Sequence, residues 1–558
     1  MSVCVQYARP NSAQAESEIV GLDVAVNNLF SAWFKYGRQE KFICRPVDLQ
    51  SFAHFKQLAR EAGIDAEARC VGLEPRTPQQ NLEKISCLFR PDPMINTPIW
   101  QRQQLKGHGY AACGLVHTMS GERIAQVFGE LLLAPSSSGD ALICPSAAVR
   151  DAVHNLWKIY ADYLAYRSGG TFECPIETPV IPLGIDTEKF ARIAAPEKRA
   201  AQRAALGAAD DEIVILFVGR LSFATKAHPL ALMAAAERAA KSCKRKLRLV
   251  LFGYFKPGNM EPHFRNLAAD IGKTARIEIV MNDDPRFPDG LWAGADIFAS
   301  LSDNIQESFG LTPVEAMACG LPAVISNWDG YRGGVRDTEE GFLIPALAPP
   351  PESGLAIAEH YYNDRNYGVA LATASQSTAI DIARCAAAFL VLAENDATRR
   401  EMGAKGRARA QEIYDWRHII KSYEDLWEDM AQKRRALSPQ SARGVPQGWQ
   451  AAHPSFPNPW QMFASYPSGF LKAEDRLRVV MNADEITALL KHEMNFFVPD
   501  LLMPREALRG LIEVIRKAGL PRVADLLAVL PPTEHARTWR CIGWALKLGI
   551  CELDRKAL

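Results

Sequence analysis

The sequence predicts an α/β protein with two domains on mostly parallel sheets, followed by a mainly helical third domain. Short apolar runs alternate with longer amphipathic stretches up to about residue 435, which is typical of repeated strand–helix units. This rhythm stops in the charged, alanine-rich stretch from Ile185 to Asp211 and starts again at residue 213. Residues 460–558 show helical patterns and no run of buried strands.

The expected strands are short apolar segments bounded by turn residues. The last five are separated by helical lengths, as the crossover connections of a parallel sheet require. They span residues 3–8, 141–144, 179–183, 213–219, 247–253, 276–280, 296–300 and 322–326.

Four segments follow from these patterns. We expect one α/β domain over residues 1–195 and a second over residues 196–436. Residues 437–459 are rich in proline, serine and glycine and predict a linker. The accessory domain over 460–558 ends as helix, turn, longer helix and short strand, which resembles the helix pattern of a winged-helix domain.

Composition narrows the function classes. The 64 lysines and arginines balance 64 aspartates and glutamates, so no overall basic field favours nucleic acid as a partner. The 12 cysteines lack paired short spacings, which indicates reduced thiols rather than zinc or disulfides. The chain shows neither a signal-peptide pattern nor 18 consecutive apolar residues. We therefore expect a cytoplasmic protein, with peripheral attachment at the inner membrane surface left open.

The segment from Glu307 to Gly320 contains the clearest local pattern. Thr312 as N-cap, Pro313 at the first helical position and Glu315 three residues after the cap predict a capping box. Gly320 and Pro322 predict the end of this helix. A helix N-terminus suits a diphosphate or sugar hydroxyls, and Gly310 permits close approach to its backbone. Spacing alone leaves about even odds that Glu315 only caps and Glu307 is a solvated loop acid.

Three further side chains are candidates for the same site. Arg220 directly follows a strand that ends at Gly219, and Lys226 stands six residues later, so the two cations can clamp a diphosphate. The alternative is that both are ordinary surface cations. His117 follows an apolar run, where a lone histidine is usually structural; His108 is the second histidine considered.

The segment ESFGLTPVEAMACGLP at 307–322 resembles the signature of glycosyltransferase family 4. The Gly219–Arg220–Leu221 stretch with Lys226 resembles the family's diphosphate motif. The resemblance covers about residues 100–435. It implies a GT-B fold, in which two Rossmann-like domains face each other across a cleft. The domain at residues 1–195 is then on the acceptor side, and the domain at 196–436 binds the nucleotide sugar. The resemblance also implies retaining hexosyl transfer from a nucleotide-diphosphate sugar without an obligatory metal.

The resemblance also implies roles for single residues. His117 and Glu307 face the donor sugar, Arg220 and Lys226 bind the diphosphate, and Glu315 holds the ribose. The backbone of Gly219 and of Ser308, Phe309, Gly310 and Leu311 contacts sugar or phosphate. The family's glycine-rich loop is not evident in residues 8–21. The acceptor is expected to be a glycan, a lipid-linked group or another hydroxyl compound of a cell-envelope or extracellular polysaccharide pathway.

Other readings stay open from sequence alone. A relative of the same fold with epimerase or phosphorylase chemistry is one. A binding or regulatory protein that kept the fold and lost catalysis is another, with the C-terminal unit recognising a peptide or nucleic acid. In a transferase, the C-terminal domain is expected to bind a protein or the acceptor. The joint presence of the five charged or histidine residues favours the transferase.

Overall fold

The computed structural model describes residues 2–9, 21–74, 79–105, 108–255, 260–364, 366–496 and 501–554. The chain divides into two compact units, residues 1–453 and 454–558. Residues 10–20, most of the segment in which the family's glycine-rich loop is expected, lie outside the described residues.

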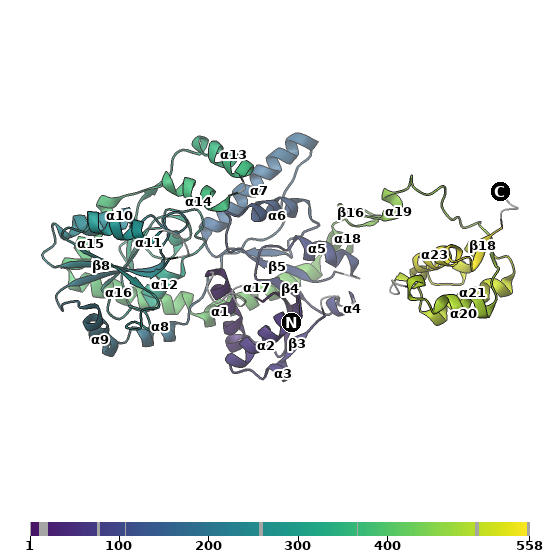
Figure 1. The fold of residues 1–558 in the computed structure, drawn as a ribbon, viewed down its shortest axis with the longest axis horizontal. Coiled ribbons are helices and arrows are strands. Elements are labelled where there is room, and N and C mark those ends of the chain that lie inside the picture. Colours follow the sequence, from purple (N-terminus) through teal and green to yellow (C-terminus); the bar gives the residue numbers. More distant parts are fainter. Residues whose placement is uncertain are drawn as a thin grey trace. The chain divides into compact units, whose positions relative to one another are not determined.

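The first unit begins with a parallel six-stranded sheet in the order β3-β2-β1-β4-β5-β6, with helices on both faces (Figure 1). Its central strands are mostly apolar and buried, as expected when helices cover a sheet on both sides, whereas the edge strand at residues 70–72 exposes two of its three residues. The described strands are β1 (Val3–Tyr7), β2 (Phe42–Pro46), β3 (Cys70–Gly72), β4 (Cys87–Arg90), β5 (Ala111–Leu115) and β6 (Ala141–Ile143). The helices are α1 (Gly21–Tyr36), α2 (Leu49–Glu61), α3 (Ala66–Arg69), α4 (Gln79–Leu82), α5 (Asn96–Gln101), η2 (Arg102–Gln104), α6 (Glu122–Leu133) and α7 (Ala147–Ser168).

A second six-stranded parallel sheet follows, in the order β12-β11-β10-β7-β8-β9. Its strands are β7 (Ile213–Arg220), β8 (Leu247–Tyr254), β9 (Arg276–Met281), β10 (Ile297–Ser300), β11 (Ala323–Ser326) and β12 (Gly341–Ile344). The helices of this part are α8 (Thr187–Ile193), α9 (Pro196–Leu206), α10 (Pro229–Ala240), α11 (Glu261–Ile271), α12 (Leu311–Ala318), η3 (Asp329–Gly333), α15 (Ile382–Glu394), α16 (Asp396–Arg409), η5 (Ala410–Tyr414) and α17 (Trp416–Ala436). Between β13 (Ala346–Leu347) and β14 (Ala379–Ile380) lie η4 (Pro351–Gly354), α13 (Leu355–Asp364) and α14 (Tyr367–Gln376).

Both sheets have the same strand order when each is numbered from its own first strand, and this is the doubly wound Rossmann order. The predicted α/β fold class of GT-B type is therefore confirmed. One expected strand is wrong: residues 179–183 form only a single bridge, between Cys144 and Val180. Pro179 and Pro182 lack the N–H groups that a continued ladder needs.

The helix α17 returns to the first sheet after the second is complete. It packs against α1 and β5, and its Trp427 ring meets Trp33 edge-on, with ring centroids 5.9 Å apart. Glu424 accepts hydrogen bonds from the backbone N–H and the Nε of Arg38 at 2.9 and 2.7 Å. Although the predicted boundary groups residues 196–436 with the second domain, the buried aromatic side chains of α17 pack on the first, where Phe89 of β4 contacts both Tyr423 and Trp427.

The predicted linker is packed over its first half. Residues 437–459 contain a short helix, α18 (Pro439–Arg443), and Ala442 within it is 2 % exposed. The Arg434 side chain donates to the carbonyl of Ala442 at 2.5 Å, which ties α18 to α17. The strand β15 (Ala451–His453) completes the described part of the first unit.

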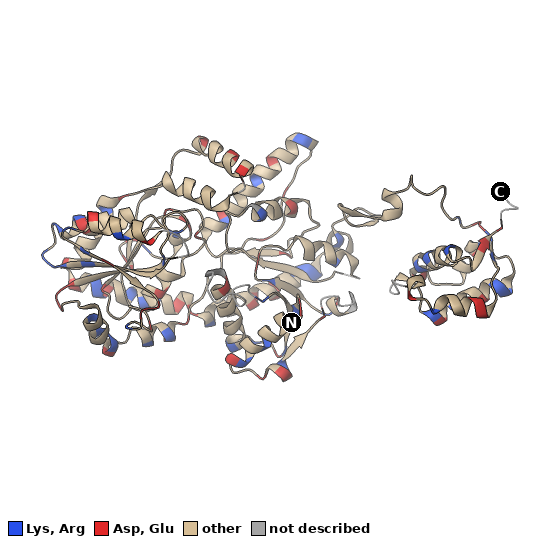
Figure 2. Cartoon of the chain, viewed as in Figure 1, with Lys and Arg blue, Asp and Glu red and all other residues tan. Residues whose placement is uncertain are grey.

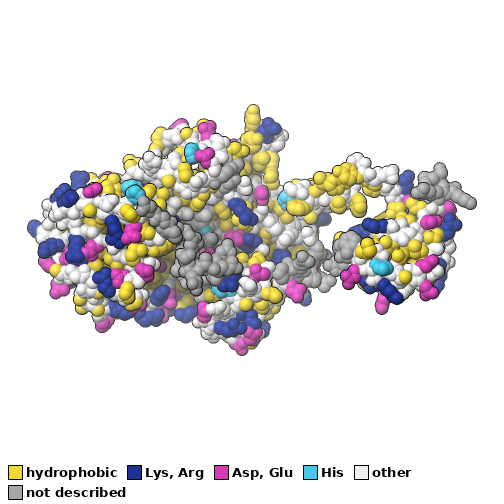
Figure 3. Space-filling view, in the orientation of Figure 1, with side chains coloured by type: hydrophobic (Ala, Val, Ile, Leu, Met, Phe, Trp, Pro, Cys, Tyr) yellow, Lys and Arg dark blue, Asp and Glu magenta, His cyan; other side chains and the backbone are white. Residues whose placement is uncertain are grey.

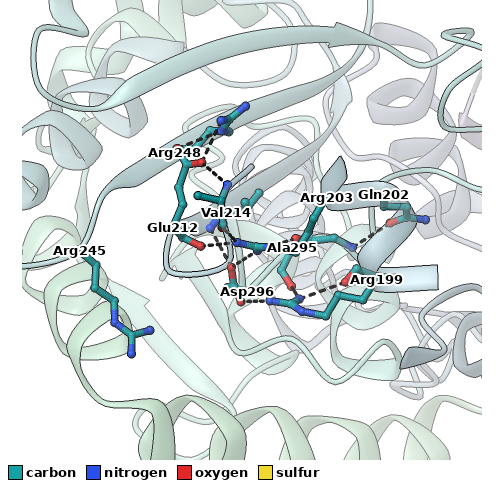
Figure 4. Close-up of polar contacts among 12 residues, drawn as sticks. Arg199, Gln202, Arg203, Glu212, Val214, Arg245, Arg248, Ala295 and Asp296 are labelled. Atoms are coloured by element: carbon teal, nitrogen blue, oxygen red, sulfur yellow. Dashed lines mark hydrogen bonds and ion pairs between the residues drawn. The ribbon is translucent and has the colours of Figure 1, made fainter. Parts of the chain in front are cut away.

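A cluster of buried charged side chains in the second domain connects the amino ends of its strands (Figure 4). Asp296, just before β10, pairs with Arg203 at 3.0 Å and accepts the backbone N–H of Val214 at 2.9 Å. Arg248 pairs with Glu212 at 2.9 Å. These buried charges are all paired, and they lie at the end of the sheet opposite to Gly219. We therefore assign them a structural role.

The second unit is small and mainly helical, as predicted. Its elements are β16 (Phe456–Pro457), α19 (Pro459–Met462), β17 (Leu477–Val479), α20 (Ala483–Leu490), η6 (Glu493–Asn495), α21 (Arg505–Ala518), α22 (Val523–Ala528), α23 (Pro532–Lys547) and β18 (Cys551–Leu553). The last three give the expected order of helix, longer helix and strand, and β18 pairs antiparallel with β17. Apolar side chains gather on the surface around α19 (Figure 3), where Trp460 is 65 % exposed.

The structure also shows how charged residues and cysteines are distributed along the chain. Lysines and arginines are interspersed with aspartates and glutamates along the helices in the view of Figure 2. None of the 12 cysteines is in a disulfide. In the described parts of the chain, no helix is both long and apolar enough to cross a bilayer.

The packing of α17 yields a first prediction. Trp427→Ala removes a side chain that is 2 % exposed and should lower the free energy of unfolding of the first unit by about 3–5 kcal/mol. Urea denaturation followed by circular dichroism measures this. Trp460→Ala, at a side chain 65 % exposed, is the control and should change stability little. Equal effects of the two substitutions would contradict the packing described for α17.

Candidate functional site

The carboxyl ends of β7 and β10 mark the switch point of the second sheet. Crossovers from β7 and from β10 leave in opposite directions, which opens a crevice where doubly wound sheets bind ligands. Arg220 is the last residue of β7, and residues 301–310 follow β10. The predicted donor residues of this domain therefore lie at the edge of the sheet that topology favours.

The helix α12 begins two residues earlier than the sequence predicts, so the capping box is wrong. Gly310 is the N-cap, with φ of 88°, and the structure shows no side-chain cap hydrogen bond. Thr312 and Pro313 are the second and third helical residues, and Glu315 is the fifth. The cause is the left-handed backbone of Gly310, which lets the chain turn into the helix before Thr312. The predicted end is confirmed, because Gly320 and Leu321 donate to the carbonyls of Met317 and Ala316 at 2.8 and 3.0 Å.

Two glycines permit the tight packing around this turn. A Cβ on Gly310 would stand 2.2 Å from the Tyr331 ring, and one on Gly330 would stand 2.2 Å from the Ser308 carbonyl carbon. The short helix η3 therefore lies directly against the loop that carries Glu307. Tyr331 is held in place by a 2.9 Å hydrogen bond between its hydroxyl and that of Ser300.

Lys226 and Glu307 form an ion pair between the turn after β7 and the loop after β10. Burial alone would raise the pKa of Glu307, but the Lys226 ammonium and the backbone N–H groups of Phe309 and Gly310 outweigh it and lower this pKa. Burial alone would lower the pKa of Lys226, yet Glu307 raises it. Both side chains are therefore charged at neutral pH.

Arg220 is held at one corner of its guanidinium. Its Nη2 donates to the carbonyl oxygen of Thr225 at 2.9 Å and to the side-chain oxygen of Gln306 at 3.3 Å. Its Nε is buried and has no hydrogen-bond partner among the described residues. A buried donor without a partner is costly, so this atom is a candidate contact for an anionic ligand.

Glu315 is half-buried on α12, and the structure gives its carboxylate no hydrogen bond among the described residues. Burial raises its pKa to about 7, although Lys189 and Lys226 act in the opposite direction. When it is ionised, a carboxylate without a protein partner can accept hydrogen bonds from two hydroxyl groups of a ligand.

The side chains of Phe309 and Leu311, two other predicted site residues, pack into the core. The Phe309 side chain is 5 % exposed and packs on Tyr414 with ring centroids 5.9 Å apart. Leu311 is partly buried against the same core. The Ser308 carbonyl accepts a hydrogen bond from the Ser146 hydroxyl at 2.8 Å. Gly219 pairs with Gly253 on β8, where a Cβ on Gly253 would stand 1.8 Å from the Gly219 oxygen.

The bond from Ser146 to Ser308 joins the two domains at their carboxyl edges. Ser146 is the N-cap of α7 and follows β6 of the first sheet. The helix α7 also packs against η3. The carboxyl end of the first sheet therefore meets the Glu307 loop of the second.

His117 lies in the loop after β5, at the carboxyl edge of the first sheet. Its Nε2–H donates to the Pro91 carbonyl at 2.7 Å, which leaves Nδ1 as an acceptor. Burial lowers its pKa to about 4, so the ring is neutral near pH 7. His108 instead contacts the Leu437 carbonyl at 2.7 Å, beside the end of α17, and has a structural role.

Sequence reasoning missed Asp329, in η3. Its φ of 44° is unusual for a residue other than glycine, and burial together with the charge of Glu307 raises its pKa well above the usual range. It accepts a 2.9 Å hydrogen bond from Ser302. No local pattern marks it, because its environment is created by residues 20 to 30 positions earlier. No group of three or more His, Cys, Asp or Glu side chains in the described residues could hold a metal ion.

Comparison with known proteins gives a family match within the second domain. Residues 198–350 match the family "Glycosyl transferases group 1". This stretch contains Arg220, Lys226, Glu307 and Glu315, but not His117.

Two curated relatives share the match. A D-inositol 3-phosphate glycosyltransferase of Geodermatophilus obscurus is 34 % identical over 179 residues, which cover 31 % of this chain and 38 % of that protein. The protein of the same name from Kineococcus radiotolerans is 31 % identical over 269 residues, 47 % of this chain and 54 % of its own length. The chain thus spans between two fifths and about half of these relatives.

A similar solved structure is that of Alr3699/HepE from Anabaena in complex with UDP. It is 16 % identical in sequence, covers 77 % of this chain and all of the Anabaena chain, and has a TM-score of 0.49.

The turn before α12 yields a second prediction. Gly310→Ala places a side chain at φ of 88° and against Tyr331, so it should lower stability by about 2 kcal/mol or more and displace the Glu307 loop. Thermal unfolding and affinity for nucleoside diphosphates measure the two effects. Gly333→Ala, where a Cβ meets nothing within 4 Å, should leave both unchanged. If both variants behave like wild type, the described turn is incorrect.

Proposed function

We propose that the chain is a retaining glycosyltransferase that moves a sugar from a nucleotide-diphosphate donor to a hydroxyl acceptor. The observation that carries the proposal is the meeting of Arg220, Lys226 and Glu307 at the switch point of the second sheet, directly before an uncapped helix N-terminus. The match of residues 198–350 to a glycosyltransferase family supports the same reading.

The donor's diphosphate is proposed to bind Arg220, Lys226 and the backbone around Gly219 and Gly310. Arginine supplies a planar fork and lysine a mobile charge, so two cations with different geometry can follow the charge as it moves to the leaving group. The first N–H groups of α12 add a partial positive charge without a competing cap. These groups would take the place of a metal ion in stabilising the leaving diphosphate.

The sugar and ribose are proposed to lie between these cations and two carboxylates. Glu307, whose pKa is lowered, is ionised and favours positive charge developing at the anomeric carbon. Glu315 would accept the ribose hydroxyls. Neutral His117 would accept a donor hydroxyl through Nδ1 from the opposite domain.

In the proposed step, the bond from the anomeric carbon to the diphosphate breaks and its electron pair leaves with the diphosphate. The acceptor oxygen forms the new bond on the same face of the sugar, and its proton passes to the departing phosphate oxygen. Exclusion of water by the meeting of the two domains would limit hydrolysis of the donor.

The identity of the acceptor is proposed only as a class of compound. A cell-envelope or extracellular polysaccharide acceptor, handled in the cytoplasm or at the inner membrane surface, fits the resemblance to glycosyltransferase family 4. The second unit is proposed to recognise that acceptor or a partner protein. The first domain, in which acceptor contacts are expected, lies mostly outside the family match at residues 198–350.

A panel of UDP-, GDP-, ADP- and dTDP-sugars tests the function, with release of nucleoside diphosphate as the readout. Arg220→Ala should reduce kcat/KM for the consumed donor about 10- to 100-fold, because a charge-assisted contact is lost. Glu307→Gln should also reduce it and leave the fold intact by circular dichroism. Arg332→Ala, at an exposed neighbour in η3, is the control. Failure to consume any of these donors would instead favour a binding protein.

The raised pKa of Glu315 gives a pH prediction. If its carboxylate accepts the ribose hydroxyls, the bound state favours the ionised form, and affinity for the nucleoside diphosphate should rise about tenfold from pH 6 to pH 8. Isothermal titration calorimetry at both pH values measures this. Glu315→Gln should bind weakly with a flat profile, and a 2′,3′-dideoxy ligand should show no rise in the wild type. An equal rise with the dideoxy ligand would contradict the assigned role.

The same group affects stability with a definite sign. Its pKa is raised on folding, so protonation favours the folded state. This contribution is complete below about pH 4.5 and is lost as the pH rises to about 7. Without ligand, Glu315→Gln should therefore stabilise the protein relative to wild type at pH 8 more than at pH 5.5.

A further inference from the structure

Tyr367 is the one side chain of α14 with described hydrogen bonds to both domains. The helix is fixed at its far end, where the Ser375 hydroxyl donates to buried Asp303 at 2.9 Å in the loop after β10. At its near end, Asn366 caps the helix by accepting the Val369 N–H at 3.1 Å. The Tyr367 hydroxyl therefore extends from the capped first turn of a helix whose far end is bonded to the loop after β10.

Three hydrogen bonds join Arg220 to the first domain through this hydroxyl. Arg220 Nη2 donates to the Gln306 side-chain oxygen at 3.3 Å. The Gln306 Nε2 donates to the Tyr367 hydroxyl oxygen at 3.2 Å. The Tyr367 and Ser120 hydroxyls lie 2.7 Å apart. Because Tyr367 accepts from the amide, its own hydrogen is left for Ser120, so all three bonds can point the same way and strengthen one another.

The position of Ser120 makes this link informative. Ser120 stands three residues after His117, in the loop at the carboxyl edge of the first sheet. A second hydrogen bond between the domains runs from the Ser146 hydroxyl, which follows β6, to the Ser308 carbonyl and is 2.8 Å long. The two bonds together fix residues 306–308 against the first domain on either side of Glu307.

We infer that Tyr367 is a positioning residue that aligns the Arg220 guanidinium with the His117 loop when the two domains meet. It holds Gln306, which accepts a hydrogen bond from Arg220 Nη2, the nitrogen on the same edge of the guanidinium as the partnerless Nε. The effect of Tyr367 on catalysis rests on the proposed function, because the proposed function assigns the diphosphate to Arg220. The existence of the hydrogen-bonded link does not depend on the proposed function.

The hydrogen-bonded link through Tyr367 predicts that its loss lowers kcat but leaves the affinity for the donor nucleotide unchanged. The proposed diphosphate contacts all belong to the second domain, so donor affinity should survive loss of a bond to the first. The reacting state, in which the domains meet, should lose the energy of about one hydrogen bond. For Tyr367→Phe we therefore expect kcat to fall about fivefold, with the dissociation constant of the nucleoside diphosphate within about twofold of wild type.

The test compares Tyr367→Phe, Ser120→Ala and the double variant in the full chain. Tyr166→Phe, which removes the same hydroxyl from a side chain 85 % exposed, is the matched control. Steady-state kinetics with the donor found in the nucleotide-sugar panel gives kcat, and calorimetry with UDP, GDP or ADP gives affinity. Because both substitutions break one link, the double variant should equal Tyr367→Phe alone rather than the product of the two effects.

Hydrogen exchange without any ligand is an independent readout. Tyr367→Phe should speed exchange in residues 118–121, and Ser120→Ala should speed it in the first turn of α14, since each breaks the same bond from opposite sides. If no nucleotide sugar is consumed, the proposed function fails and this exchange result alone decides the link. Multiplicative kinetic effects, or unchanged exchange in an active enzyme, would overturn the inference while leaving the function intact.

Discussion

The ion pair between Lys226 and Glu307 is the interaction on which the geometry of the candidate site depends. It ties the turn after β7 to the loop after β10, the two elements that border the switch point. Removing either partner would leave the other as an uncompensated, partly buried charge. The packing of η3 on the same loop, made possible by Gly310 and Gly330, prevents the pair from relaxing into solvent.

The same pair is compatible with the proposed binding of a diphosphate. Lys226 has three N–H groups, so in the proposed complex it can keep its bond to Glu307 and also donate to a phosphate oxygen. Glu307 is satisfied from its backbone side by Phe309 and Gly310, which fixes its carboxylate at the mouth of the site. Asp329 lies near enough for the Glu307 charge to raise its pKa, so the carboxyl groups here differ in ionisation although all belong to one cluster.

Much of the fold and part of the site could be predicted from sequence. Seven of the eight expected strands form, because apolar runs between turn residues are local signals. Strands such as β2 and β4 were missed because their apolar runs, FIC and CLF, are only three residues long before an arginine interrupts them. Arg220, Lys226 and Glu307 were found through a recognisable pattern, and the structure brings them together; Asp329 and Tyr367 carry no such pattern.

The sequence by itself determined the α/β class, the restart of the strand–helix alternation after residue 211 and the loop that carries Glu307. Each of these depends on residues that are close together in the sequence. Only the tertiary structure decided how α12 begins: the competing capping box at Thr312 lost to a left-handed Gly310 that packs under Tyr331. It also decided that α17 completes the first domain and that Tyr367 reaches Ser120, 247 residues away. Contacts over such separations depend on how sheets stack, and no local pattern encodes them.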